Sequence, residues 1–201
     1  MADTTTLLER ACRTAADLIR TGALVSATAA VFFSLEGVFR FGLLLLALLV
    51  PRLAGLRSPV DLLVCVVLSV AAWSSPANWY ELAPWYDTAL HLVTPGTVAV
   101  TLHLLLIRAR LLPSPRARGL RIASAPLLTV CLGCTVALLW ELYEWFAEKV
   151  LGAAIVVGYD DTVLDMAAGL TGSLVAGGLL VSWAHSGPRA HRDRDTGPLP
   201  G

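Results

Sequence analysis

Three short motifs in this chain each place two ionisable side chains at helical spacing. The pairs are Asp87 and His91 in YDTALH, Glu141 and Glu144 in WELYEW, and Asp161 and Asp165 in DTVLD. Residues three or four apart lie on one face of an α-helix, about 5 to 6 Å from each other. Each motif is therefore expected to present two polar groups from one helix face.

The chemistry that suits these six groups is the binding of a divalent metal ion. Grouped carboxylates repel one another near a lipid boundary, and Lys149 and Arg40 are too few to neutralise five of them. A divalent cation supplies two charges at one point and is well coordinated by carboxylate and imidazole groups. We therefore predict a metal site formed by Asp87, His91, Glu141, Glu144, Asp161 and Asp165.

A cluster of interhelical hydrogen bonds and salt bridges is the structural alternative. Helix capping accounts for Asp87 and Asp161, because acidic side chains stabilise helix amino termini. Capping does not account for Glu141 and Glu144, which come at the end of an apolar run, where the helix dipole disfavours negative charge. Both interpretations stay open on the sequence.

The elements that must position these groups are membrane helices. The 201 residues are 56% hydrophobic with a mean hydropathy of +0.70, which is too apolar for an ordinary soluble domain. The formal net charge is zero, so no nucleic-acid partner is expected, and membrane lipids are the expected surroundings. The predicted fold class is all-α, a polytopic transmembrane helix bundle.

Six spans are favoured and five are the alternative. About 20 helical residues cross the hydrocarbon core, and residues 60–74, 85–107, 123–147 and 161–184 approach or exceed that length. Residues 15–54 form either one long helix or two helices that turn near 35–40. The arginine-rich segment 108–121 is expected in the cytoplasm, and the alternation of basic loops then favours six spans with both termini cytoplasmic.

Three regions follow from this topology. Residues 1–20 have the spacing of an amphipathic interfacial helix, 21–185 form the transmembrane domain, and 186–201 form a disordered cytoplasmic tail. The topology also places the start of 85–107, the end of 123–147 and the start of 161–184 at the outer face. The three ionisable pairs are thus expected at one height.

Other polar or small residues have simpler explanations. The Cys131 and Cys134 pair is interpreted as small-residue packing rather than a redox or zinc site. His103 is interpreted as a hydrogen-bonding residue, and a stripe of small residues from Gly169 to Gly177 as a close helix contact. Glu36 and Arg40, four apart, are expected to pair, with Glu36 as a further possible ligand.

The order D-x-x-x-H, W-E-x-x-E-W, G-Y-x-D-T-x-x-D over about 85–175 resembles the YjdF-like family of bacterial inner-membrane proteins. More distantly it is similar to VanZ-like proteins, which use D-x-x-x-H, E-x-x-Q and D-x-x-x-N in the same order. The resemblance implies a multi-pass protein of the bacterial plasma membrane without an established activity. The acid or amide that often follows the last aspartate by four residues is Gly169 here, so Thr171 or Ser173 would have to take any role it has.

Three classes of function remain open on the sequence. An enzyme would use the metal to polarise an oxygen of a lipid-linked or envelope precursor. A non-catalytic module would use the cluster to hold helices together or to recognise a headgroup or partner. An ion or proton transporter is the weakest of the three, because the cytoplasmic halves of these helices offer His103 and hydroxyl groups but no acid.

Overall fold

The computed structural model describes residues 2–112, 120–155 and 158–186, and these form helices and no strand. In chain order they are α1 (Ala2–Ala30), α2 (Leu35–Leu53), α3 (Ser58–Ser74), the short 3-10 helix η1 (Trp79–Glu81), α4 (Tyr86–Arg108), α5 (Leu120–Lys149) and α6 (Tyr159–Ser186). The predicted all-α fold class is confirmed.

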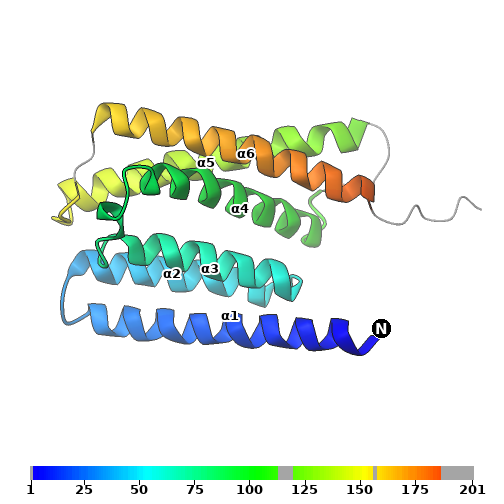
Figure 1. The fold of residues 1–201 in the computed structure, drawn as a ribbon, viewed down its shortest axis with the longest axis horizontal. Coiled ribbons are helices and arrows are strands. Elements are labelled where there is room, and N and C mark those ends of the chain that lie inside the picture. Colours follow the sequence, from blue (N-terminus) through cyan, green and yellow to red (C-terminus); the bar gives the residue numbers. More distant parts are fainter. Residues whose placement is uncertain (1, 113–119, 156–157, 187–201) are drawn as a thin grey trace, which may run out of the picture.

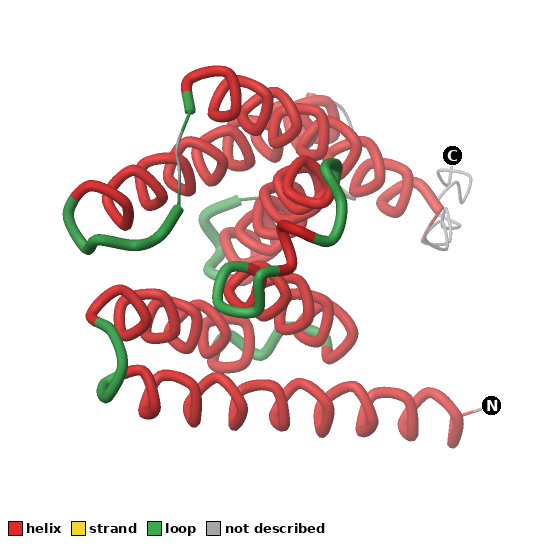
Figure 2. The backbone as a smooth tube through the Cα atoms, turned by 60° about the vertical axis from the view of Figure 1, so that its left-hand side comes forward, coloured by secondary structure: helices red, strands yellow, loops and turns green. Residues whose placement is uncertain are grey.

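The six α-helices fall into two groups of three. Helices α1, α2 and α3 pack together as the N-terminal half, and α4, α5 and α6 pack together as the C-terminal half (Figure 1). Figure 2 shows the same separation from another direction, with α1 at one edge of the molecule. Helices α3 and α4 connect the halves, and the Tyr143 hydroxyl donates a hydrogen bond of 2.8 Å to Glu36 across the boundary.

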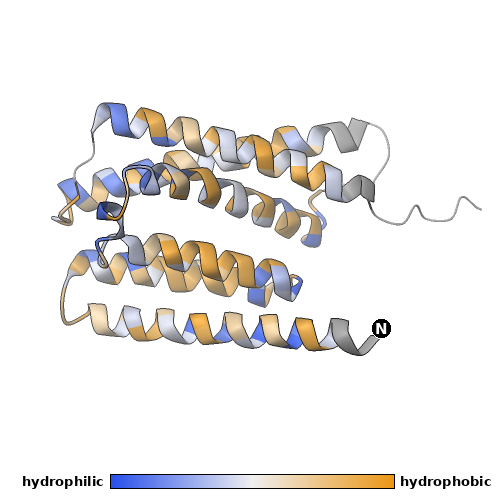
Figure 3. Ribbon diagram, in the orientation of Figure 1, coloured by the Kyte–Doolittle hydropathy of each residue, from blue (hydrophilic) through white to orange (hydrophobic). Residues whose placement is uncertain are grey.

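Within the described chain, three helices are long and apolar enough to cross a membrane: α4, α5 from Ser124, and α6 up to Trp183. Figure 3 shows hydrophobic residues along most of their length and hydrophilic residues gathered near the helix ends. Helix α3 is apolar but has only 17 residues, fewer than the roughly 20 that a perpendicular crossing needs. The number of crossings, six or five, stays a prediction.

The stretch 15–54 forms two helices rather than one. Helix α1 ends at Ala30 and α2 begins at Leu35, so the turn comes a few residues before the position expected at 35–40. The reason is the N-cap of α2: the Ser34 hydroxyl accepts a hydrogen bond of 2.9 Å from the Gly37 amide. Glu36 and Arg40 consequently lie inside α2, where they form the expected ion pair at 2.7 Å.

Helix α1 is continuous through residue 20, the predicted boundary of the amphipathic segment. Ala16, Ala23 and Ala30 recur every seven residues and are buried against α2 and α3. The interfacial position predicted for residues 1–20 concerns a membrane and stays a prediction. The predicted disordered tail lies outside the described residues from 187 onward.

Glycine allows α4 and α6 to approach closely. A Cβ atom added to Gly172 would lie 1.7 Å from the Leu92 carbonyl oxygen, and one added to Gly96 would lie 2.7 Å from the Gly172 oxygen. Small residues at such crossings let helix backbones come together. This confirms the close contact expected from the small-residue stripe, and it brings the first turns of α4 and α6 side by side.

Candidate metal centre

The three ionisable pairs meet at one end of the molecule, where α4 begins, α5 ends and α6 begins (Figure 1). We call this the cluster end. The residues that could share a metal ion there form two groups around His91: Asp87, His91 and Asp165, and His91, Glu141 and Glu144. The structure thus brings together five of the six predicted side chains. Asp161, one turn before Asp165 on α6, is exposed and belongs to neither group.

His91 is the centre of the cluster and has no exposed surface. Its Nε2 atom faces α4 and α6, 3.5 Å from Asp87 Oδ1 and 3.9 Å from Asp165 Oδ2. Its Nδ1 atom faces α5, 3.5 Å from Glu141 Oε1. Each ring nitrogen therefore has a carboxylate in front of it, from three helices in total.

Four of the atoms in this cluster are buried without a hydrogen-bond partner. They are Asp87 Oδ1, both ring nitrogens of His91, and Glu141 Oε1. Buried polar groups are nearly always hydrogen-bonded, so a group of four such atoms needs an explanation. Separations of 3.5–3.9 Å are long for hydrogen bonds, whereas ligand atoms on one tetrahedral ion at about 2.1 Å are roughly 3.4 Å apart.

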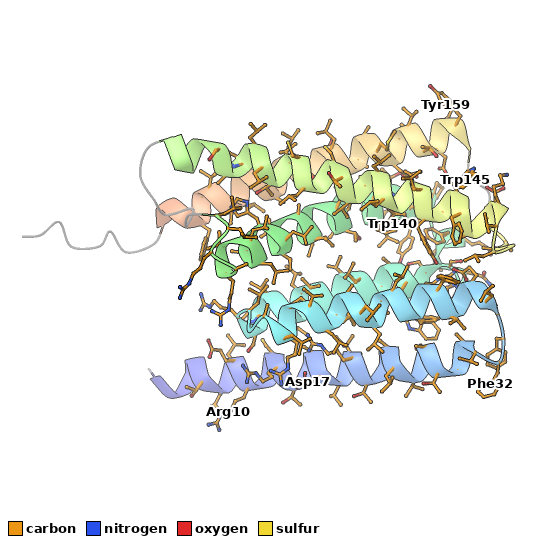
Figure 4. All side chains as sticks on the ribbon, turned by 180° about the vertical axis from the view of Figure 1, so that it is seen from behind. Arg10, Asp17, Phe32, Trp140, Trp145 and Tyr159 are labelled. Atoms are coloured by element: carbon orange, nitrogen blue, oxygen red, sulfur yellow. The ribbon has the colours of Figure 1, made fainter. Side chains whose placement is uncertain are left out.

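Glu144 already has a hydrogen-bond partner on its own helix. Its Oε1 atom accepts a hydrogen bond of 2.8 Å from the Trp140 indole N–H, one helical turn earlier on α5. The Trp140 ring also lies against the His91 ring, with centroids 4.4 Å apart. Figure 4 shows Trp140 between the two groups of helices, so it forms the wall of the cluster toward the N-terminal half.

The nearby cations do not neutralise the cluster. Arg40 is paired with Glu36 at 2.7 Å and Lys149 with Glu148 at 2.7 Å. Among the described residues, no lysine or arginine forms an ion pair with the four acids around His91. These are Asp87, Glu141, Glu144 and Asp165, so the positive charge that would balance them must come from protons or a bound cation.

Sequence reasoning missed a second polar network, in the N-terminal half. The Arg20 guanidinium donates to Asp61, to Asp17 at 3.0 Å and to the Leu48 carbonyl at 2.9 Å, and Arg52 pairs with Asp17 at 3.2 Å. Asp61 and Arg20 lie 41 residues apart in the chain. The sequence feature that could have indicated this network is Asp61, an acidic residue directly before a long apolar run.

The simpler explanation of His103 agrees with the structure, whereas the packing role predicted for Cys131 and Cys134 stays a prediction, since Cys131 is exposed. His103 Nδ1 and the Thr129 hydroxyl lie 3.1 Å apart and share a hydrogen bond between α4 and α5. The hydroxyls of Thr171 and Ser173 donate to carbonyls of their own helix. A Cβ atom at Gly169 would lie 2.7 Å from that of Ala137, so this position has little room for a longer side chain.

A family described as "Predicted membrane protein (DUF2238)" matches residues 16–186. The chain belongs to this family. The match covers all of α4, α5 and α6 and therefore the whole cluster. It supports a membrane protein and assigns no activity. No curated protein and no solved structure matches the chain.

Proposed function

We propose that this DUF2238 protein binds a divalent metal ion through Asp87, His91 Nε2 and Asp165. The observation that carries the proposal is the fully buried His91 ring, whose unpartnered nitrogens face carboxylate oxygens at 3.5–3.9 Å. An uncompensated group of buried carboxylates is unfavourable, and a shared cation removes both the repulsion and the unpartnered atoms. Asp87 is about one-third exposed, which leaves a path for an ion.

The Nε2 side is favoured over the Nδ1 side because of what the glutamates already do. Glu144 is held by Trp140, so the Nδ1 side has fewer free oxygens. A metal-bound histidine usually donates its second ring N–H to a carboxylate, which fixes the ring and its tautomer. Glu141 Oε1, 3.5 Å from Nδ1, is placed for that role. In this arrangement Asp87 and Asp165 bind the ion, and Glu141 orients His91.

The donor set favours a transition metal. Imidazole suits Zn²⁺ and other first-row ions, whereas sites for Ca²⁺ or Mg²⁺ are built from oxygen ligands alone. Two aspartates and one histidine leave a position open on a four-coordinate ion, as in catalytic rather than structural zinc sites. The proposed ion is therefore Zn²⁺ or Mn²⁺ with a free coordination position.

The proposed activity is that of an enzyme acting on a lipid or envelope precursor in the bacterial plasma membrane. A metal with an open position can polarise a substrate oxygen or activate water. The residue order shared with YjdF-like and VanZ-like proteins supports this assignment to a bacterial membrane family and names no reaction. The non-catalytic alternative is a cluster that holds three helices together through protons and buried water.

Elemental analysis of the purified protein tests the proposal. The wild-type protein is expected to carry about one transition metal ion per chain, and both His91→Ala and Asp165→Asn to lose it. Glu141→Gln is expected to keep the site with roughly 10- to 100-fold lower affinity, since it removes an orienting partner. Asp161→Asn, a matched change one turn away on the same helix, should keep full occupancy. A wild-type protein without metal after purification in zinc- and manganese-containing buffers would support the non-catalytic alternative.

A further inference from the structure

A cavity of about 420 Å³ lies between the two halves of the molecule, beside the metal centre. Residues of α2, α3, α4 and α5 form most of its wall. Its volume falls within the range of about 300–1,000 Å³ that is typical of ligand sites. Binding of a metal ion by Asp87, His91 and Asp165 does not require this cavity.

The cavity is polar at one end and apolar along the rest. The polar residues are Glu36, Arg40, Ser75, Tyr80, Tyr143 and Glu144. Five of them come from the parts of α2, η1 and α5 nearest the cluster end, and Ser75 directly follows α3. The apolar wall continues along α2 from Leu43 to Ala47 and along α5 back to Val136. From Glu36 to Ala47 is 11 residues, about 16 Å along a helix axis and about half of a bilayer's hydrocarbon core.

The charges at the polar end disfavour an anionic head. Glu36 and Arg40 neutralise each other, and the Tyr143 hydroxyl also donates to Glu36. Burial, with a further contribution from the neighbouring Asp87 carboxylate, raises the pKa of the Tyr80 phenol, which therefore stays a neutral hydroxyl. A phosphate would face Glu144 without surplus positive charge, because Arg40 is already paired with Glu36.

Two features connect the cavity to the metal centre. Trp140 and Glu144 line the cavity, while Trp140 also contacts His91 and Glu144 can share an ion with it.

We infer that the cavity binds an amphiphile with a single apolar chain and an oxygen-rich head without negative charge, with the head beside the metal centre. The chain occupies the apolar length between α2 and α5, and the hydroxyls of Ser75 and Tyr80 contact the head. Binding of the chain depends on the cavity alone. The placement of the head next to a metal rests on the proposed function.

Photolabelling with a monoacylglycerol that carries a diazirine in its acyl chain tests this inference. Irradiation of the purified full-length protein is expected to label cavity residues such as Leu68 and Val98, identified by peptide mass spectrometry. Ala47→Trp fills the cavity and should reduce this labelling at least tenfold. Ala167→Trp, exposed on α6 and outside the cavity, should leave it unchanged. Ala71→Trp fills the cavity from α3 and serves if Ala47→Trp does not fold.

Labelling confined to surface positions such as Leu127 and Leu164, or unaffected in both cavity-filling variants, would overturn the inference. Competition then tests the head: unlabelled monoacylglycerol should displace the probe at least tenfold better than dodecyl phosphate, and the reverse order would overturn a head without negative charge. His91→Ala separates the two proposals. This variant is expected to lose the metal and to keep full labelling of the cavity. In the wild-type protein, bound metal without cavity labelling would contradict only the cavity inference. Cavity labelling without bound metal would contradict only the metal centre.

Discussion

The molecule contains two polar networks, one partly exposed and one largely buried, that differ in charge balance. In the N-terminal half, the two guanidiniums of Arg20 and Arg52 face the two carboxylates of Asp17 and Asp61, and the charges balance. In the C-terminal half, four carboxylates surround one histidine, and no lysine or arginine of the described chain pairs with them. The first network is complete within the chain, whereas the second lacks positive charge.

This difference is the basis for proposing a function beyond packing for the C-terminal cluster. A balanced network with satisfied hydrogen bonds needs nothing from outside, so the N-terminal network is structural. The C-terminal cluster leaves four buried atoms without partners, which a structural network would not retain. Charge balance and hydrogen-bond satisfaction separate the two more clearly than burial does, since Asp61 and Asp165 are almost equally buried, at 3% and 2% exposure.

The largest expected effect tests the structural role of the N-terminal network. Asp61→Asn leaves the buried Arg20 with only the half-exposed Asp17 as a charged partner, and it is expected to destabilise the protein by about 3 kcal/mol, the lower end of the cost of breaking a buried ion pair, with the metal content unchanged. Thermal unfolding in detergent measures the loss. The double variant Arg20→Met with Asp61→Leu should recover most of it, and a double variant as unstable as Asp61→Asn would contradict a balanced pair.

Metal removal is expected to have the next largest effect, and only through the C-terminal cluster. With free metal at 100 times its Kd, binding stabilises the folded state by about 2.7 kcal/mol, so a chelator should lower the unfolding temperature. The Asp165→Asn protein should show no such shift. A chelator effect of the same size in Asp165→Asn would place the metal elsewhere.

The close contact of α4 with α6 links packing to the metal centre. Gly172→Ala places a Cβ against the Leu92 carbonyl, and we expect a loss of about 1–3 kcal/mol together with weaker metal binding, because α6 must move away from His91. Gly178→Ala is the matched control on α6, since nothing lies within 4 Å of its added Cβ. Metal titration of both proteins measures the difference. Equal affinities would show that the contact does not position Asp165.

The smallest expected effect concerns repulsion in the metal-free cluster. Glu144→Gln removes one of the four acids, and we expect the chelated protein to become more stable by about 0.5 kcal/mol, the scale of a like-charge pair. Chemical denaturation in the presence of a chelator measures this change. Glu81→Gln, at the exposed position of η1, is the control and should have no effect. Destabilisation by Glu144→Gln would mean that its bond with Trp140 outweighs the repulsion.

Helical spacing was sufficient to predict most of the C-terminal half. The pairs in YDTALH, WELYEW and DTVLD each fix a helix face, and three apolar runs of adequate length fix the helices that carry them. The turn before α2 lies a few residues earlier than the sequence analysis predicts, because Ser34 caps the amino terminus of this helix. The Arg20 and Asp61 pair could not be predicted, since it depends on how α1 packs against α3.

Which of the acidic residues lie next to His91 could be seen only in the structure. The sequence spacing does not distinguish Asp161 from Asp165. In the structure, only Asp165 lies on the buried face of α6, next to His91. Spacing also cannot tell which ring nitrogen faces which helix. That assignment comes from the side-chain geometry, in which Nε2 faces the two aspartates and Nδ1 faces Glu141.

Anomalous diffraction from crystals of the protein grown with Zn²⁺ tests the central claim most directly. The account predicts one strong anomalous peak about 2.1 Å from His91 Nε2, within bonding distance of Asp87 and Asp165. A peak bound to Nδ1 between Glu141 and Glu144 would contradict the proposed ligand set. The absence of any peak around His91 would contradict the metal centre itself.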